Sequence, residues 1–292
     1  MKIFKEIESI ITPPPAHMVG NGFRVHNFFP HGIRSDDRMS PFFLMDYNAK
    51  MEFLASEIPR GVGVHPHRGF ETVTIAYHGR VAHHDSAGNS GIIGEGDVQW
   101  MTAASGILHK EYHEKSYSQK GGLFQMVQLW VNLPAKDKMS PPKYQPLLHE
   151  QMGKYKLDND GGEVYVIAGE YNGIKGQAST FTPINLFDIR LNNKARIEMD
   201  FPEPYNTGLL IIEGKVLIND IETVAADHFV LFKNAGTGIK IESLENSMIL
   251  VLNGEPIHEP VAQYGPFLMN TEEELQQAID DFNGGKFGFL ED

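Results

Sequence analysis

Apolar and polar residues alternate along most of this chain, in short segments that end at glycine, proline or Asn-Gly. Val73, Ile75 and Tyr77 are separated by polar or small residues, which places all three on one face of an extended strand. Similar patterns predict strands at residues 1–12, 23–29, 41–45, 123–133, 164–169, 182–191, 194–199 and 208–219. The pattern therefore predicts an all-β protein.

One amphipathic helix is predicted at the C-terminal end. Leu275, Ala278, Ile279 and Phe282 have the i, i+3, i+4, i+7 spacing of a single helix face. Thr271, or the Asn before it, can cap the first turn. We expect this helix to serve packing rather than chemistry.

The two halves of the chain share a faint repeat. Residues 77–81 (YHGRV) with Asp85 match residues 212–216 (IEGKV) with Asp220, 135 positions later. Such a repeat predicts two copies of one barrel. Residues 134–146 (PAKDKMSPPKYQP) are rich in Pro and Lys and are predicted to link them. The predicted domains are therefore an N-terminal barrel at 1–140 and a C-terminal barrel with a helical tail at 141–292.

Histidines gather between residues 61 and 114, where seven of the chain's 13 lie. Two pairs have the two-residue period of a strand: His65 with His67, and His109 with Glu111. Each pair can therefore present two ligands to the inside of a barrel. Three neutral imidazoles and one carboxylate suit Fe, Mn, Ni, Cu or Zn better than Mg or Ca.

Two further observations bear on the metal prediction. His83 and His84 are adjacent, so they would face opposite sides of a strand, and we predict them as turn residues. Asp97 and Gly106 match Asp227 and Gly236 at a second offset, 130 positions. The first ligand pair, at offset 135, corresponds to Asp200 and Pro202, and the second pair, at offset 130, corresponds to Ile239 and Ile241. The sequence therefore predicts one metal site, in the N-terminal barrel only.

The motifs HPHRGFET, beginning at His65, and GDVQWMTAASGILHKE, ending at Glu111, resemble the pirin family of the cupin superfamily. The resemblance covers nearly the whole chain. It implies a bicupin with two tandem antiparallel jelly-roll barrels, and an Fe(II) site formed by His65, His67, His109 and Glu111. General cupins draw their carboxylate from the first motif, which makes Glu71 the alternative ligand. The resemblance also implies a monomer.

Composition narrows the function. The chain has 292 residues, a formal net charge of −13, a pI near 5.4 and no cysteine. An acidic chain is ill suited to bind nucleic acid or anionic membrane directly, and no disulfide or thiolate is available. No signal peptide or membrane span is evident, so we expect a soluble protein of the cytoplasm, or of the nucleus if the source is eukaryotic.

Four protein ligands leave open positions on a six-coordinate metal, which is typical of a catalytic site. The resemblance implies a quercetin 2,3-dioxygenase-like enzyme that cleaves flavonol-type substrates with O₂. Glu111 would bind the metal or accept the 3-hydroxyl proton, and Arg68 would steady an anionic substrate. Gln125, in the strand predicted at residues 123–133, can point into the cavity of the N-terminal barrel. The predicted aromatic and apolar lining is Phe42, Phe43, Phe70, Trp100 and Met101.

Two other functions fit the same residues. The resemblance also implies a metal- and redox-dependent regulator, acting as a transcriptional co-regulator or on a metabolic enzyme through a protein partner. A third reading is an isomerase or related cupin enzyme that uses Zn, Mn or Ni as a Lewis acid. Metal content and an oxygen-uptake assay separate the three.

Overall fold

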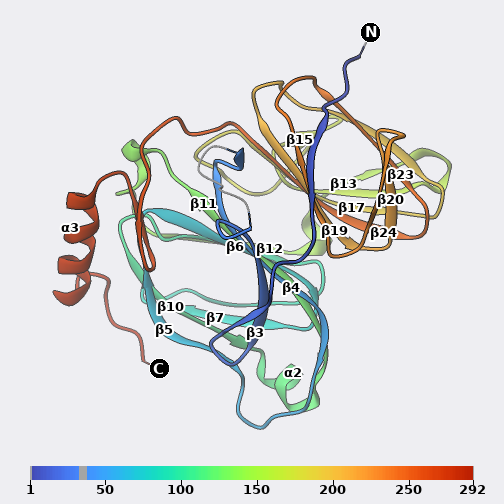
Figure 1. Cartoon of the computed structure of the whole chain (residues 1–292). Helices are drawn as coiled ribbons and strands as arrows, with labels where there is room; N and C mark the ends of the chain where they lie inside the picture. The colour runs from blue at the N-terminus through green and yellow to red at the C-terminus, as the bar shows by residue number, and fades with distance from the viewer. Residues whose placement is uncertain (1, 33–37, 292) are drawn as a thin grey trace. The chain divides into compact units, whose positions relative to one another are not determined.

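The computed structural model describes residues 2–32 and 38–291, and most of its regular secondary structure is strand (Figure 1). The chain forms two compact units. We call Pro15–His31, Phe42–His149 and Ile257–Asp292 the N-terminal barrel. The C-terminal barrel comprises Met1–Pro14, Gly32–Pro41 and Glu150–Pro256. The all-β, two-barrel prediction is confirmed.

The N-terminal barrel consists of two antiparallel sheets. One has seven strands in the order β12-β9-β6-β11-β4-β3-β2, and the other has four in the order β5-β10-β7-β8. The larger sheet contains β2 (His17–Val19), β3 (Phe23–Phe29), β4 (Phe42–Phe53), β6 (Phe70–His78), β9 (Val98–Thr102), β11 (Gly122–Asn132) and β12 (Lys143–Leu147). The smaller contains β5 (Gly61–His67), β7 (Val81–Asp85), β8 (Ser90–Ile93) and β10 (Ile107–His113).

The C-terminal barrel repeats this design. Its sheets have the orders β1-β22-β19-β24-β17-β14-β13 and β18-β23-β20-β21. The larger contains β1 (Ile7–Ile11), β13 (Gly153–Lys156), β14 (Gly162–Ala168), β17 (Ile184–Leu191), β19 (Asn206–Glu213), β22 (Phe229–Phe232) and β24 (Ser247–Gly254). The smaller contains β18 (Arg196–Asp200), β20 (Lys215–Ile218), β21 (Glu222–Ala225) and β23 (Gly238–Ser243).

Short elements complete the chain. They are the hairpins β15 (Glu170–Tyr171) with β16 (Ile174–Lys175) and β25 (Ala262–Tyr264) with β26 (Phe267–Met269), the 3₁₀ turns η1 (Ala135–Asp137), η2 (His149–Gln151) and η3 (Asp158–Asp160), and the helices α2 (Lys115–Lys120) and α3 (Glu272–Asn283). Within residues 2–32 and 38–291, no helix has the length and apolar character needed to cross a membrane.

The predicted repeat is visible in the backbone. Gly79 and Gly214 both turn the chain at positive φ, +85° and +82°, between the same pair of strands in each barrel. Such angles favour glycine because it has no Cβ. Strand register corrects the predicted equivalents by one residue. Since His109 pairs with His65, and Ile239 pairs with Met199, the counterpart of His65 is Met199 rather than Asp200.

The compact units differ from the two continuous halves that the sequence predicts. β1 pairs with β22 and so belongs to the C-terminal barrel. Part of the predicted linker is β12, which pairs with β9 and forms an edge of the N-terminal barrel's larger sheet. Pro146 is tolerated there because an edge strand does not need every N–H in the sheet. Only residues 134–142 of the predicted linker lie outside strands.

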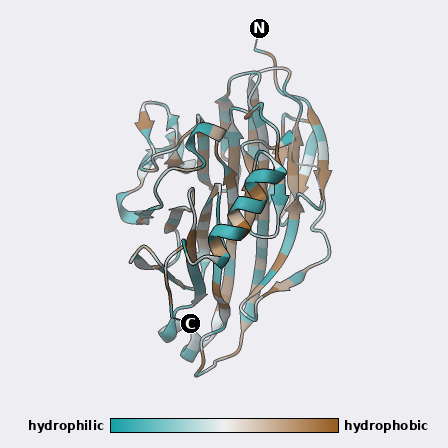
Figure 2. Cartoon of the chain, turned by 90° about the vertical axis from the view of Figure 1, so that its left-hand side faces the viewer, coloured by the Kyte–Doolittle hydropathy of each residue, from teal (hydrophilic) through white to brown (hydrophobic). Residues whose placement is uncertain are grey.

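The predicted C-terminal helix is α3, and it belongs to the N-terminal barrel. Thr271 caps it, with Glu274 completing a capping box. Leu275 and Ala278 are buried against Phe267 and neighbouring apolar residues, as the helical stripe predicts. The side of α3 turned to the viewer in Figure 2 is mostly hydrophilic, as expected of a helix that packs with one face.

Candidate metal centre

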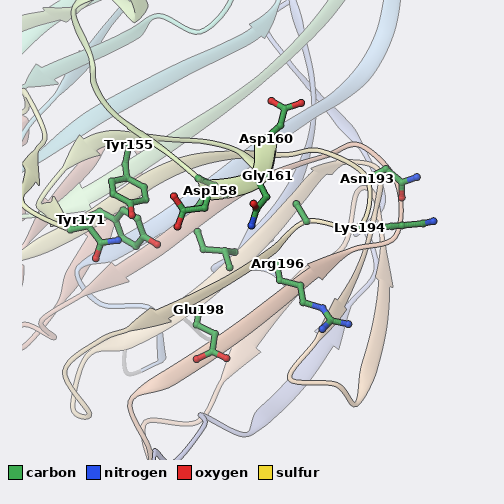
Figure 3. Close-up of a pocket in the computed structure, with 14 residues that line it drawn as sticks. Tyr155, Asp158, Asp160, Gly161, Tyr171, Asn193, Lys194, Arg196 and Glu198 are labelled. Carbon is green, nitrogen blue, oxygen red and sulfur yellow. The ribbon is translucent and has the colours of Figure 1, made fainter.

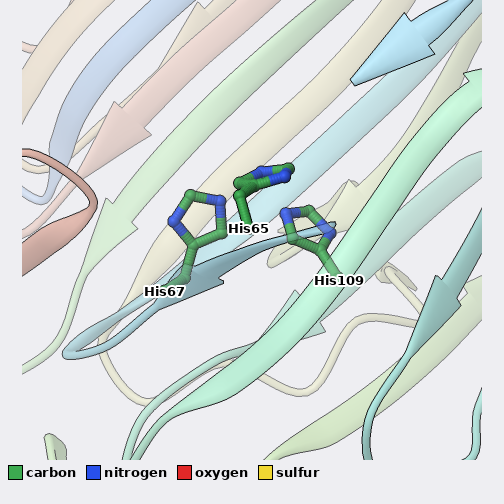
Figure 4. Close-up of side chains that lie close together, drawn as sticks. All are labelled: His65, His67 and His109. Atoms are coloured by element: carbon green, nitrogen blue, oxygen red, sulfur yellow. The ribbon is translucent and has the colours of Figure 1, made fainter. Parts of the chain in front are cut away.

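Three of the four predicted ligands meet in the N-terminal barrel. β5 and β10 pair so that His109 lies opposite His65, and the rings of His65, His67 and His109 gather over these two strands (Figure 4). Their centroids lie 4.3 to 4.8 Å apart, and one nitrogen from each ring lies within 4.8 Å of the others. The two-residue spacing does what the sequence predicts, because alternate strand residues share a face.

Hydrogen bonds orient these rings. Nδ1 of His65 lies 2.8 Å from the carbonyl oxygen of Gly63, and Nδ1 of His67 lies 3.4 Å from that of Pro266. A carbonyl can only accept, so each Nδ1 carries the proton and each Nε2 keeps its lone pair. Nε2 of His109 is buried and has no hydrogen-bond partner. A buried imidazole nitrogen without a partner is what a metal ligand requires before the metal binds.

Electrostatics favour neutral rings. Burial lowers the pKa of His67 well below its usual value, and the neighbouring imidazole of His65 adds to the effect. Burial, followed by the imidazoles of His65, His67 and His83, lowers the pKa of His109 in the same way. Neutral imidazole is the form that binds a cation. The donor set therefore fits a first-row metal.

Glu111, the fourth predicted ligand, lies beside this cluster and is held by other side chains. Its Oε1 accepts hydrogen bonds from Gln99 Nε2 at 3.0 Å and Thr74 Oγ1 at 3.2 Å, and its Oε2 accepts one from Gln128 Nε2 at 2.6 Å. A carboxylate oxygen of Glu111 lies within 4.8 Å of nitrogens on His83 and His109, but not of all three clustered imidazoles. The structure thus brings three predicted ligands together and places Glu111 next to them.

His83 is placed differently from its prediction as a turn residue. It lies in β7, opposite Glu111 on β10, and is fully buried. Nδ1 of His83 lies 3.5 Å from Nδ1 of His109. The turn prediction is therefore wrong for both residues, since both lie in β7. Adjacent strand residues face opposite sides, and His84 contacts the hydroxyl of Tyr112. The spacing of His83 with Asp85 repeats that of the two ligand pairs and was the missed signal.

Two other polar candidates are engaged elsewhere. Glu71 accepts a hydrogen bond from Thr102 Oγ1 at 2.7 Å, and burial raises its pKa to about 7. Among the described residues, it belongs to no group of side chains that could hold a metal. Gln125 donates to the hydroxyl of Tyr47 at 2.8 Å. It lies in β11, between β6 and β4, and so does not close a sheet edge.

Arg68 is buried and occupied by neighbouring groups of the same barrel. Its Nη1 lies 2.8 Å from Asp281 Oδ2, its Nε donates to the carbonyl oxygen of Ser105 at 2.8 Å, and its guanidinium lies 4.7 Å from the ring centroid of Phe287. Lys286 and Arg68 together hold the pKa of Asp281 well below its usual value. The predicted contact of Arg68 with an anionic substrate stays a prediction, and it would require this ion pair to open.

Aromatic side chains flank His67. Phe70 lies 5.0 Å and Trp130 5.3 Å from the His67 ring, and these two aromatic rings stack on each other at 4.2 Å. Phe43 stacks on Trp130 in turn. Trp130 was missed because it lies within an apolar strand whose inner face the sequence does not identify. The other predicted lining residues, Phe42, Trp100 and Met101, are fully buried.

The C-terminal barrel has a hollow of another kind. A pocket of about 400 Å³ runs between Tyr155 and Tyr171 on one side and Lys194 on the other (Figure 3). Its lining includes carboxylates but no imidazole. The positions equivalent to the ligands are filled by Met199, Ile239 and their apolar neighbours. In the described part of the chain, both groups of side chains that could hold a metal lie in the N-terminal barrel.

A pair of antiparallel jelly-roll barrels with imidazoles and a carboxylate inside one of them defines a two-barrel cupin. Residues 22–131 match the Pirin family profile, and residues 186–288 match the Pirin C-terminal cupin domain. The chain therefore belongs to the pirin family.

Individual relatives support this assignment. The chain is 44% identical to the "Putative quercetin 2,3-dioxygenase" of Pseudomonas aeruginosa, over 97% of this chain and 98% of that one. It is 39% identical to Pirin of Homo sapiens, over 86% of this chain and 84% of that one. A crystal structure of quercetin 2,3-dioxygenase from Acinetobacter baumannii matches with a TM-score of 0.93 and 43% identity, covering 99% of this chain and 100% of that one.

Proposed function

We propose that this protein is a metal-dependent dioxygenase that cleaves flavonol-type substrates such as quercetin with O₂. The observation that carries the proposal is the cluster of His65, His67 and His109, with the buried Nε2 of His109 lacking a partner. The names of two relatives, a "Putative quercetin 2,3-dioxygenase" and a quercetin 2,3-dioxygenase, support the same reaction.

The metal ligands in this proposal are His65, His67, His109 and Glu111. Three imidazoles and a carboxylate fit Fe(II), which we propose as the resident metal, and they also fit Mn, Ni, Cu or Zn. A redox-active metal held by these four residues would supply electron transfer between the substrate and O₂.

The chain's own groups bind the substrate and move its proton. Trp130 is partly exposed beside His67 and stacks on the buried ring of Phe70, so its ring suits a flat aromatic substrate. In this proposal Glu111 binds the metal or accepts the 3-hydroxyl proton. Because Gln99, Thr74 and Gln128 all donate to Glu111, they fix the direction in which its carboxylate points. His67 and His109 are buried, which limits the contact of these two rings with water.

Oxygen uptake tests this proposal. Protein loaded with Fe(II) should consume O₂ when quercetin is added, and His65→Ala and His109→Ala should lose nearly all of that uptake. His84→Ala is the matched control, since His84 faces away from the site on the same strand as His83. The proposal fails if the loaded protein shows no quercetin-dependent uptake, or if His65→Ala keeps full turnover.

A second function is favoured by the acidic charge of the chain. The alternative is a regulator whose partner protein reads the state of the metal, and the net charge of −13 suits protein contacts better than DNA contacts. A partner that binds the ferrous and ferric forms differently would support it. Equal binding by apo, ferrous and ferric protein would refute it.

A further inference from the structure

A buried series of contacting side chains connects the carboxylate of Asp85 to the candidate metal ligand His109. Asp85 Oδ2 lies 3.2 Å from His83 Nε2, and His83 Nδ1 lies 3.5 Å from His109 Nδ1. Asp85, His83 and His109 are almost fully buried, and the ring of Tyr144 stacks on His83 with centroids 5.0 Å apart. The series crosses from β7 to β10 inside the N-terminal barrel.

Neighbouring groups fix which nitrogen of His83 carries its proton. The hydroxyl of Tyr144 donates to Gln99 Oε1 at 3.2 Å, and Gln99 Nε2 donates to the Glu111 carboxylate at 3.0 Å. Both contacts orient the Gln99 amide the same way. The same Nε2 lies 3.4 Å from His83 Nδ1. An amide nitrogen can only donate, so Nδ1 of His83 is an acceptor and its Nε2–H donates to Asp85.

The same reasoning extends to His109. With His83 Nδ1 as an acceptor, the facing Nδ1 of His109 carries a proton, and the lone pair of His109 lies on Nε2. That is the buried nitrogen without a partner. His65 and His67 reach the same state through the carbonyl groups of Gly63 and Pro266. The Nδ1 proton of His109 is therefore held by the side chains of His83 and Asp85, which we call the relay, whereas the Nδ1 protons of His65 and His67 are held by backbone oxygens.

We propose that Asp85 and His83 are positioning residues, which hold His109 in the form that offers Nε2 to the metal and thereby set the affinity of the site. This inference rests on the proposed metal centre. The competing arrangement makes His83 a direct ligand together with His109 and Glu111, whose ligand atoms also lie within 4.8 Å of one another.

Asp85 has two roles, since it contacts His83 and also accepts hydrogen bonds from the backbone of the turn at Ala87 and Asn89. The variant Asp85→Asn is chosen to change the first role while keeping the second. Oδ1 accepts from the backbone N–H groups of Ala87 and Asn89, whereas Oδ2 faces His83. The side-chain Nδ2 of Asn89 donates to both oxygens, at 3.1 and 3.0 Å. An Asn side chain can keep the hydrogen bonds to Oδ1 with its oxygen and loses the Asn89 contact at Oδ2. Its amide nitrogen would then donate to His83 Nε2 and move the proton of His83 to Nδ1, against His109. In the apo protein, His109 would then favour the tautomer with its lone pair on Nδ1. The metal could bind Nε2 only by reversing that tautomer, which lowers the affinity without removing the ligand.

Co(II) is the probe for the first experiment, with affinity measured by competition against a chelator and the number of bound imidazoles counted by X-ray absorption. Asp85→Asn and His83→Phe should each bind Co(II) about 10- to 100-fold more weakly than the wild type, the usual effect of losing an outer partner of a ligand. Both should retain the wild-type number of imidazoles. His84→Ala should bind like the wild type. The proposal would be overturned if both variants bound Co(II) with an affinity within about twofold of the wild type.

The imidazole count tests the competing arrangement. If His83→Phe binds one imidazole fewer than the wild type, then His83 is itself a ligand and the positioning role is wrong. His83→Phe also answers the question if Asp85→Asn does not fold, since a phenyl ring keeps most of the volume stacked on Tyr144.

A second measurement needs no metal. In ¹⁵N long-range NMR spectra of the apo protein, His109 should carry its proton on Nδ1 in the wild type and on Nε2 in Asp85→Asn. Wild-type protein that shows this pattern but binds no Co(II) would refute the metal centre and leave the relay intact. Wild-type protein that binds Co(II) with His109 protonated at Nε2 in the apo form would refute the relay alone.

Discussion

Gln128 Nε2 lies 2.6 Å from Glu111 Oε2, and this contact joins the two sheets of the N-terminal barrel. Gln128 lies in β11 of the larger sheet, and Glu111 lies in β10 of the smaller one. Together with Gln99 and Thr74, the amide surrounds the carboxylate with donors from three strands of the opposite sheet. Glu111 is therefore held in place before any metal binds.

Replacing Gln128 should weaken metal binding. Gln128→Leu removes the shortest of the three hydrogen bonds to Glu111, so the carboxylate loses its fixed direction, and we expect Co(II) affinity to fall about tenfold. Gln125→Leu is the matched control, because it removes a buried amide from the same strand without touching Glu111. Chelator competition measures both variants. Equal affinities in the two would show that Gln128 does not position the carboxylate.

Breaking the ion pair of Arg68 should destabilise the N-terminal barrel. Arg68→Ala leaves Asp281 without its buried partner, which typically costs about 3–5 kcal/mol of the free energy of unfolding. Lys286→Ala removes the other cation at Asp281, but Lys286 is mostly exposed, so we expect a loss of about 1 kcal/mol or less. Urea unfolding of both variants gives the comparison. A loss for Arg68→Ala no larger than that for Lys286→Ala would contradict the prediction.

Glu71 should make stability depend on pH. Its pKa is raised to about 7 in the folded protein, from an ordinary value of 4.5, so the folded state binds more protons than the unfolded state between these values. The free energy of unfolding contributed by Glu71 should therefore fall as pH rises from about 4.5 to about 7, by about 3 kcal/mol at most.

Glu71→Gln tests this directly, because Gln keeps an oxygen for the hydroxyl of Thr102 but cannot ionise. Urea unfolding at pH 5 and pH 8 should show the wild type losing stability relative to Glu71→Gln at the higher pH. A difference between the two proteins that stays constant across this range would rule out the raised pKa.

The number of metal ions bound per chain should reflect a single site in the N-terminal barrel. We expect one metal per chain, and binding should stabilise the protein by about 2.7 kcal/mol when free metal is 100 times its Kd. Elemental analysis should show the metal lost in His109→Ala. Ile239→Ala, at the equivalent position of the C-terminal barrel, should keep the metal while costing about 2–5 kcal/mol of stability through its cavity. Two metals per chain, or loss of metal in Ile239→Ala, would contradict the single site.

The strands and the imidazole cluster were predictable because both depend on local spacing. Alternation located β3, β6 and β17, and the two-residue spacing of His65 with His67 placed both rings on one face. The repeat around Gly79 and Gly214 predicted the second barrel.

Long-range partners were not predictable from spacing. The pairing of β12 with β9 follows from contacts between distant segments, which a Pro-rich composition obscures. The amides of Gln99 and Gln128 reach Glu111 only after two sheets face each other, so their sequence neighbourhood carries no sign of the role. The burial of His83 depends on which face of β7 turns inward, and the sequence VAHHD of this strand does not indicate which face that is.

The first strand of the chain belongs to the C-terminal barrel and the last helix belongs to the N-terminal barrel, which affects how the protein can fold during synthesis on the ribosome. β1 emerges first, yet its partner β22 is translated only near the end, so the earliest strand must wait for most of the chain. α3 and the hairpin before it emerge last, although they complete the barrel that carries the histidines. The N-terminal barrel therefore cannot be complete until α3 has been made, and the C-terminal barrel cannot be complete until the segment that ends at Pro256 has been made. A chain truncated before Pro256 would leave both barrels with missing parts.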